Sequence, residues 1–167
     1  TEYNVIVCAM RGHTFEQNLA MLQEAREFLG QGVCGADLAG NEAAYPMADF
    51  LELFARAKEM GMPFTIHAGE CGSPANIRDA IDAGARRIGH GIAMRGQDEL
   101  KRLCRQKNIG IELCPVSNLQ TKAVESPGDY PLREFLDGGL KVTVNTDNRT
   151  VSGSTLSGEL ELVQELY

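Results

Sequence analysis

The hydrophobic positions of this chain follow two alternating periodicities along its whole length. Short apolar runs rich in β-branched residues predict strands. They lie at residues 4–9, 33–38, 64–67, 87–90, 109–113 and 141–145. Between these runs apolar residues recur every three or four positions, which predicts amphipathic helices. The helices are expected at residues 14–29, 46–61, 74–83, 97–107 and 132–136, with another beginning at 155.

Regular alternation of strand and helix is typical of a parallel β-sheet covered by helices. The strands begin about one β/α unit apart, and no linker or low-complexity segment interrupts them. Local signals agree with this reading: Thr14 and Gln17 match a capping box, and Ser73-Pro74 suits an N-cap and first helical position. A doubly wound sheet and a closed barrel both satisfy the pattern.

Candidate chemistry gathers where three predicted strands end. His67 ends the strand at 64–67 and Glu70 comes three residues later. His90 ends the strand at 87–90, and Asp147 follows the last strand. A single histidine at a strand end is more often a core residue than a ligand. The carboxyl ends of parallel strands meet at one edge, however, so we expect these four side chains to lie together. Imidazole and carboxylate groups are suitable metal ligands and acid/base catalysts.

Four motifs carry these residues and give them a shared context. They are His-Ala-Gly-Glu at 67–70, Gly-His-Gly at 89–91, Cys-Pro-Val-Ser-Asn at 114–118 and Asn-Thr-Asp-Asn at 145–148. Together they resemble the adenosine deaminase family of the metal-dependent amidohydrolase superfamily, over nearly the whole chain. The resemblance implies an α/β fold, a (β/α)8 TIM-type barrel, of which the six units here are strands three to eight. Residues 1–167 would then form one partial deaminase barrel domain.

The resemblance also implies a reaction and a role for each residue. The reaction is zinc-dependent hydrolytic deamination of adenosine to inosine and ammonia. His67 and Asp147 match zinc ligands, and Asp147 also accepts a hydrogen bond from the attacking water. His90 matches the histidine that orients this water and helps to deprotonate it. Glu70 matches the proton donor to purine N1, so its carboxyl must carry a proton for part of the cycle.

Two further positions are expected to contact the purine. Gly40 matches a glycine whose backbone N–H binds N3, where any side chain would crowd the base. Asn148 matches a position that is often aspartate in the family and that bonds N7; an asparagine amide can still donate there. The 114–118 motif is expected to be a turn that shapes the site and at most supports its ligands. His13 is not assigned to the metal.

One element of the resemblance is absent from the sequence. A catalytic zinc ion normally has three protein ligands and a water, and the family takes two from a His-x-His motif on its first strand. No His-x-His occurs here. The chain therefore matches an internal or C-terminal portion of a deaminase, without the first two strands.

The composition of the chain narrows the class of molecule that it is expected to bind. The 167 residues include 23 acidic and 16 basic side chains, a net charge of −7, which argues against nucleic acid and suits a small purine nucleoside. No apolar run approaches the ~20 residues of a membrane span, and no signal peptide opens the chain. Five cysteines without a C-x-x-C pair predict reduced thiols in a cytoplasmic protein, most of them in the core.

Other functions remain open at this level. Adenine or aminodeoxyfutalosine could replace adenosine within the same chemistry. Alternatively, the chain is a non-catalytic barrel fragment that associates with another segment through its two unpaired edges. A metal-free barrel isomerase is the least favoured, because no phosphate-binding glycine pattern follows the last strands.

Overall fold

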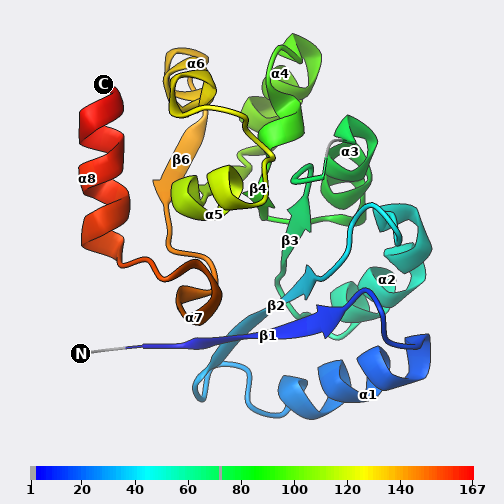
Figure 1. Cartoon of the computed structure of the whole chain (residues 1–167). Coiled ribbons are helices and arrows are strands. Elements are labelled where there is room, and N and C mark those ends of the chain that lie inside the picture. The colour runs from blue at the N-terminus through cyan, green and yellow to red at the C-terminus, as the bar shows by residue number, and fades with distance from the viewer. Residues whose placement is uncertain (1–2, 72) are drawn as a thin grey trace.

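In the computed structural model, which describes residues 3–71 and 73–167, parallel strands form a curved wall surrounded by helices (Figure 1). The strands are β1 (Val5–Met10), β2 (Val33–Ala39), β3 (Thr65–Ala68), β4 (Arg87–His90), β5 (Gly110–Leu113) and β6 (Lys141–Val144). The helices are α1 (Phe15–Arg26), α2 (Leu51–Glu59), α3 (Pro74–Ala83), α4 (Asp98–Lys107), α5 (Pro115–Gln120), α6 (Leu132–Asp137), α7 (Arg149–Ser152) and α8 (Leu156–Leu166). Three short 3₁₀ turns are η1 (Met47–Phe50), η2 (Ile92–Met94) and η3 (Pro127–Asp129).

The strands lie side by side in the order of the sequence. β1 pairs with β2, and β3, β4, β5 and β6 form a four-stranded sheet in which every pairing is parallel. A single bridge between Ala36 and Phe64 joins the two groups, where the Ala36 N–H donates to the Pro63 carbonyl at 2.9 Å. A doubly wound sheet would reverse its strand order part-way. The sequential order is that of a barrel wall, with β1 and β6 as edges of the described strands.

A glycine makes the junction between the two groups of strands. A Cβ on Gly35 would lie 2.8 Å from the Pro63 carbonyl oxygen, closer than real contacts allow. Glycine therefore lets β2 approach the start of β3. Phe64, predicted to begin the strand, makes only the isolated bridge and packs its ring on Phe54, with centroids 4.8 Å apart.

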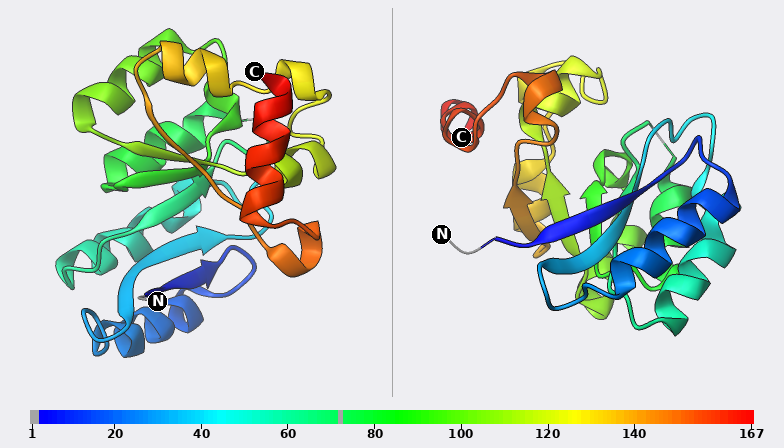
Figure 2. Two further views of the ribbon diagram at one scale, coloured as in Figure 1. Left: turned by 90° about the vertical axis from the view of Figure 1, so that its left-hand side faces the viewer. Right: turned by 90° about the horizontal axis from the view of Figure 1, so that it is seen from below.

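The core lies between the strands and the outer helices. Figure 2 shows the arrangement of these strands and helices in two further views. The apolar residues of β3 and β4 are fully buried, because helices cover their outer face and side chains fill the inner one. Large apolar side chains from successive helices complete it. They are Leu22, Phe54, Ile77, Leu100 and Phe135. The edge strand β1 is different: Val5, Ile6 and Met10 are 49%, 38% and 37% exposed.

The predicted alternation is confirmed, but several details were wrong. The capping box of Thr14 and Gln17 is present, yet α1 ends at Arg26. Leu29 still packs on the core, but from an isolated bridge with Val33 and not from the helix. Ser73 occupies the N-cap position of α3 without a side-chain capping hydrogen bond. The short helices α5 and α7 were not predicted, because α5 has only Val116 and Leu119 after its proline and α7 only Val151, too few apolar residues to show a periodicity.

The cysteines also depart from expectation. Only Cys104 and Cys114 are buried, whereas Cys8, Cys34 and Cys71 are exposed free thiols, so the prediction that most fill the core was wrong. Apolar neighbours misled here because alternate residues of a strand face opposite sides. Within residues 3–71 and 73–167, no helix is both long and apolar enough to cross a membrane.

Candidate active site

The site is centred on His67, the third residue of β3. In the sheet register His67 lies beside Gly89 of β4. A Cβ on Gly89 would meet the His67 Nδ1 atom at 3.2 Å and the His67 Cα atom at 3.3 Å. The glycine therefore leaves room for the imidazole between the two strands. This is a packing reason for the glycine that precedes His90 in the Gly-His-Gly motif.

The structure brings His67, His90 and Asp147 together. One ligand atom from each lies within 4.8 Å of the others, and the two imidazole rings meet edge to face with centroids 4.9 Å apart. His90 and Asp147 both adopt the left-handed backbone conformation, with φ of 63° and 56°. Non-glycine residues rarely adopt it, and such residues cluster at functional sites. A set of imidazoles and one carboxylate suits a small divalent cation such as zinc.

Asp37, at the end of β2, orients His67. One Asp37 oxygen lies 2.9 Å from His67 Nδ1, and the other accepts the His67 backbone N–H at 3.3 Å. Burial disfavours the charged imidazole, but the Asp37 carboxylate outweighs it and raises the pKa of His67 above its ordinary value. A carboxylate against Nδ1 leaves Nε2 as the nitrogen for a metal, the usual arrangement of metal-binding histidines.

His90 is held in its neutral form by a chain of hydrogen bonds. Tyr130 donates its hydroxyl to Asn118 Oδ1 at 3.0 Å, so the Asn118 amide group faces His90 Nδ1, also at 3.0 Å. Nδ1 then accepts, and the remaining proton is on Nε2. Burial lowers the pKa of His90, against the opposing effect of Glu70. A buried, neutral imidazole of fixed tautomer suits an acid/base role.

Glu70 lies beside this imidazole. Its carboxylate is 3.6 Å from His90 Nε2 and accepts a hydrogen bond from the Thr121 hydroxyl at 3.3 Å. Asp147 is fixed in a similar way, because the Ser117 hydroxyl donates to its carboxylate at 2.7 Å. The four predicted residues of the metal and acid/base centre therefore lie in one place. Three of them line one hollow, whose lining is His67, Gly89, His90, Glu112, Cys114, Asn145 and Asp147.

The motif at 114–118 supports the site from a helix. It is the start of helix α5 and not a turn, with Pro115 in the first turn, where its missing N–H costs nothing. Ser117 and Asn118 point from this helix to Asp147 and His90. The prediction that it supports the site agrees with these contacts.

Gly40 and Asn148 occupy positions that explain their residue types locally. Gly40 has φ of 109°, and a Cβ there would lie 3.3 Å from the Arg11 Cβ. Asn148 caps α7, where its Oδ1 accepts the N–H groups of Thr150 and Val151, both at 3.1 Å. Their contacts with a purine stay predictions. His13 is exposed, away from the group of three ligands.

Three residues important to this geometry were missed in the sequence. They are Arg11, Asp37 and Glu42, which are 1%, 9% and 4% exposed. Arg11 donates to the carbonyls of His67 and Tyr45, both at 2.6 Å. All three lie at the ends of β1 and β2 or in the loops after them. Each is a charged residue inside or shortly after a strand, which is a weaker form of the signal that identified Asp147.

Comparison with known proteins shows the family. The family model for adenosine deaminase matches residues 1–167. The chain belongs to the adenosine deaminase family. It is 43% identical over 164 residues to adenosine deaminase of Enterococcus faecalis, covering 98% of this chain and 49% of that protein. An adenosine deaminase of Clostridium botulinum is 41% identical over 163 residues, with 97% and 49% covered. The chain thus spans about half the length of these relatives.

Solved structures confirm the fold. The N6-methyl-AMP deaminase of Arabidopsis thaliana matches with a TM-score of 0.88 and 27% identity, covering 98% of this chain and 48% of that one. An adenine deaminase from Arthrobacter aurescens gives 0.87 and 28%, covering 98% and 50%. A Burkhoderia ambifaria amidohydrolase with bound Zn gives 0.86 and 25%, covering 96% and 46%. The predicted partial (β/α) barrel is therefore confirmed.

Proposed function

We propose that this chain carries the acid/base centre and part of the zinc site of a hydrolytic adenosine deaminase. The observation that carries the proposal is the convergence of His67, His90 and Asp147, whose ligand atoms lie within 4.8 Å, next to Glu70. Family membership and the 43% identical adenosine deaminase of Enterococcus faecalis support the reaction class and the substrate.

In this proposal His67 and Asp147 hold the zinc ion. Zinc, when bound, would supply an acidified water, since coordination lowers the pKa of water towards neutrality. The donor types fit, because neutral imidazole and carboxylate are standard zinc ligands and Asp37 already orients His67. This chain contributes two protein ligands, so further ligands must come from a His-x-His pair that its sequence lacks.

The other residues move protons and hold the base. Glu70 delivers a proton to purine N1, which makes C6 more open to attack by water. His90 carries its proton on Nε2, 3.6 Å from the Glu70 carboxylate, and passes it to Glu70. Its Nε2 is then free to orient the attacking water and to take up a proton from it. The backbone N–H of Gly40 would bind N3, and the amide of Asn148 would bind N7.

The substrate is the least constrained part of the proposal. The relatives named above act on adenosine by their names, whereas the solved structures include an adenine deaminase and an N6-methyl-AMP deaminase. We take adenosine as the substrate because the higher identity is to adenosine deaminases. Adenine, N6-methyl-AMP and aminodeoxyfutalosine are the competitors.

The test is amine release from these four compounds. It requires what we call the extended protein, in which this chain is joined to the parts of the Enterococcus faecalis relative that it does not cover. Adenosine should give the highest kcat/KM, with ammonia and inosine as products, and a chelator should abolish turnover. Preference for another of the four would change the substrate but keep the chemistry. No release from any of them would refute the deaminase function.

The proposal also covers the association of the chain with another segment and its location in the cell. The edges β1 and β6 could associate with another segment, which the apolar exposure of β1 supports. Size measurement of the 167-residue chain alone would detect such association. The five free thiols favour a cytoplasmic location.

A further inference from the structure

Both carboxylate oxygens of Glu42 accept hydrogen bonds, mainly from the segment that carries Glu70. Its Oε1 atom accepts the Gly69 backbone N–H at 2.6 Å and the Asn76 side-chain amide at 2.7 Å. Its Oε2 atom accepts the backbone N–H groups of Glu70 and Cys71, at 2.9 and 3.0 Å. Three successive backbone donors and one side chain therefore converge on a single carboxylate.

This arrangement is built into the fold. Glu42 is only 4% exposed. Within the described residues it accepts hydrogen bonds from uncharged N–H groups and forms no salt bridge. A carboxylate is costly to bury unless hydrogen bonds stabilise its charge, and four such bonds do so here. Asn76 is fixed in turn, because its Oδ1 accepts the Met47 N–H at 2.9 Å. The loop after β2 is thus tied to the loop after β3 and to α3.

The orientation of Glu70 depends on these bonds. Glu70 lies two residues after the last residue of β3, in irregular backbone, where the strand ladder no longer fixes its direction. Gly69, just before it, has φ of 73°, which turns the chain sharply. The Glu42 carboxylate satisfies the N–H groups on both sides of this turn. The Glu70 side chain can then point to His90 without help from sheet pairing.

We propose that Glu42 is a positioning residue for deamination, which acts by holding the backbone of Glu70. The inference rests on the proposed function, in which Glu70 is the acid. Glu42 itself faces backbone amides and does not touch the reacting atoms. Catalytic groups displaced by about 1 Å can lose roughly 100-fold in rate, so a change in this carboxylate should reduce kcat.

The test is Glu42→Gln in the extended protein. Glutamine keeps the length of the side chain but turns one acceptor oxygen into an NH₂ group that faces N–H donors. We expect kcat for adenosine to fall about 10- to 100-fold, with KM changed by only about twofold and zinc content unchanged. The matched control is Glu134→Gln, since Glu134 also accepts a backbone N–H, from Gly96 at 2.8 Å, and its other partner is Lys101, not a site residue. It should keep its kcat.

A double variant separates positioning from a general structural role. If Glu42 acts through Glu70, then adding Glu42→Gln to Glu70→Gln should change kcat by no more than about twofold, because the acid is already gone. A loss that multiplies in the double variant, or a Glu42→Gln protein with normal kcat, would overturn the proposal. A fully active Glu70→Gln protein would instead refute the acid assignment, and the positioning role with it.

A second measurement needs no variant and covers the case in which Glu42→Gln does not fold. Hydrogen exchange of the wild-type chain should show the amides of Gly69, Glu70 and Cys71 protected, although they lie outside any helix or strand. Exchange as fast as in an open loop would overturn the proposal.

Discussion

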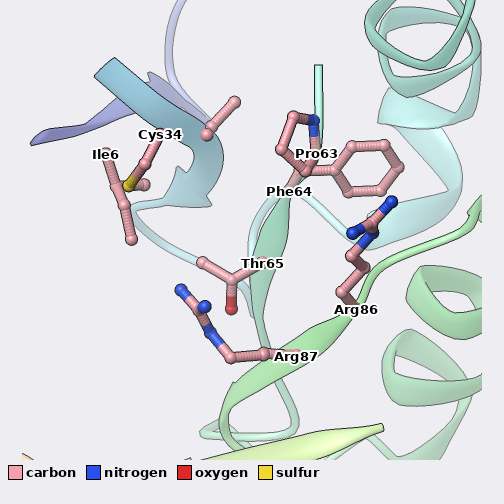
Figure 3. Close-up of a pocket in the computed structure, with 9 residues that line it drawn as sticks. Ile6, Cys34, Pro63, Phe64, Thr65, Arg86 and Arg87 are labelled. Atoms are coloured by element: carbon pink, nitrogen blue, oxygen red, sulfur yellow. The ribbon is translucent and has the colours of Figure 1, made fainter. Parts of the chain in front are cut away.

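The two ends of the parallel strands are built from opposite kinds of residue. At the carboxyl end the carboxylates of Asp37, Glu70 and Asp147 lie around two imidazoles, and Glu42 binds the backbone of the segment that carries Glu70. At the amino end a pocket opens among apolar side chains and two arginines, as Figure 3 shows. Its lining is Ile6, Cys34, Gly35, Ala36, Pro63, Phe64, Thr65, Arg86 and Arg87. The polar contacts there link Thr65 and Arg87 to Glu112.

The backbone differs between the two ends as well. Left-handed backbone occurs at both ends, but in different residue types. At or after the carboxyl ends of the strands, the non-glycine residues with this conformation include His90 and Asp147, both residues of the site. In the loops before the strands they are glycines and Asn108, types that adopt it readily. Within the described residues, no amino-end pocket residue has a positive φ. Strained backbone is retained where it aims side chains, whereas extended backbone serves the sheet pairing. The difference indicates that the carboxyl end serves chemistry and the amino end stability, as in other barrels.

The largest expected effect comes from testing the carboxyl end alone. The 167-residue chain by itself should bind zinc weakly and be inactive, because His67 and Asp147 are two ligands where a catalytic zinc normally needs three. Zinc content and adenosine turnover should be measured beside the extended protein. Stoichiometric zinc with full activity in the short chain would contradict this prediction.

Removing the acid should have the next largest effect. In the extended protein, Glu70→Gln should lower kcat by about 10²–10⁴-fold while zinc stays bound, because glutamine cannot deliver a proton. His67→Ala should differ by losing zinc as well as rate. Metal analysis and steady-state kinetics distinguish the two variants. A Glu70→Gln rate close to wild type would show that Glu70 is not the acid.

Substitution of one glycine at each end of the strands compares the two ends directly. At the amino end, Gly35→Ala should cost about 1–3 kcal/mol of stability through contact with the Pro63 carbonyl, and leave kcat unchanged. At the carboxyl end, Gly69→Ala forces a side chain onto a φ of 73° and towards Ile77 Cδ1, 2.5 Å from the new Cβ. It should lose similar stability but also lower kcat about 10- to 100-fold, by moving Glu70.

Thermal unfolding and kcat are measured for both variants of the extended protein, at a temperature where both are folded. Equal loss of kcat in the two variants would remove the functional distinction between the ends.

The smallest effect is expected at Asn148, which caps α7. Asn148→Asp keeps an acceptor for the cap but has no amide donor, so stability should hold while kcat/KM falls at least about fivefold. Asn148→Ala should lose about 1 kcal/mol of stability in addition. Both are assayed by thermal unfolding and by kcat/KM for adenosine. Three equal kcat/KM values would mean that Asn148 is a cap and does not contact the base.

Much of this protein could be predicted from local pattern. Strand and helix periodicity located six strands to within one residue at each end, because a buried strand needs apolar residues in a row and a helix needs them on one face. His67, Glu70, His90 and Asp147 were identifiable because each lies at the end of such a strand. Parallel strands place those ends at one edge whatever the details of packing.

The supporting residues required the folded chain. Glu42 is 27 to 29 residues away from the amides it binds, and Asn118 is 28 residues from His90. Such contacts depend on which loops meet across strands, and no local periodicity encodes that distance. Helices α5 and α7 also depend on tertiary contacts. Each is too short to be stable alone and forms where neighbouring elements pack against it. The residues of the proposed chemistry lie at strand ends and can be identified in the sequence. The residues that position them lie in loops that come together only in the folded chain.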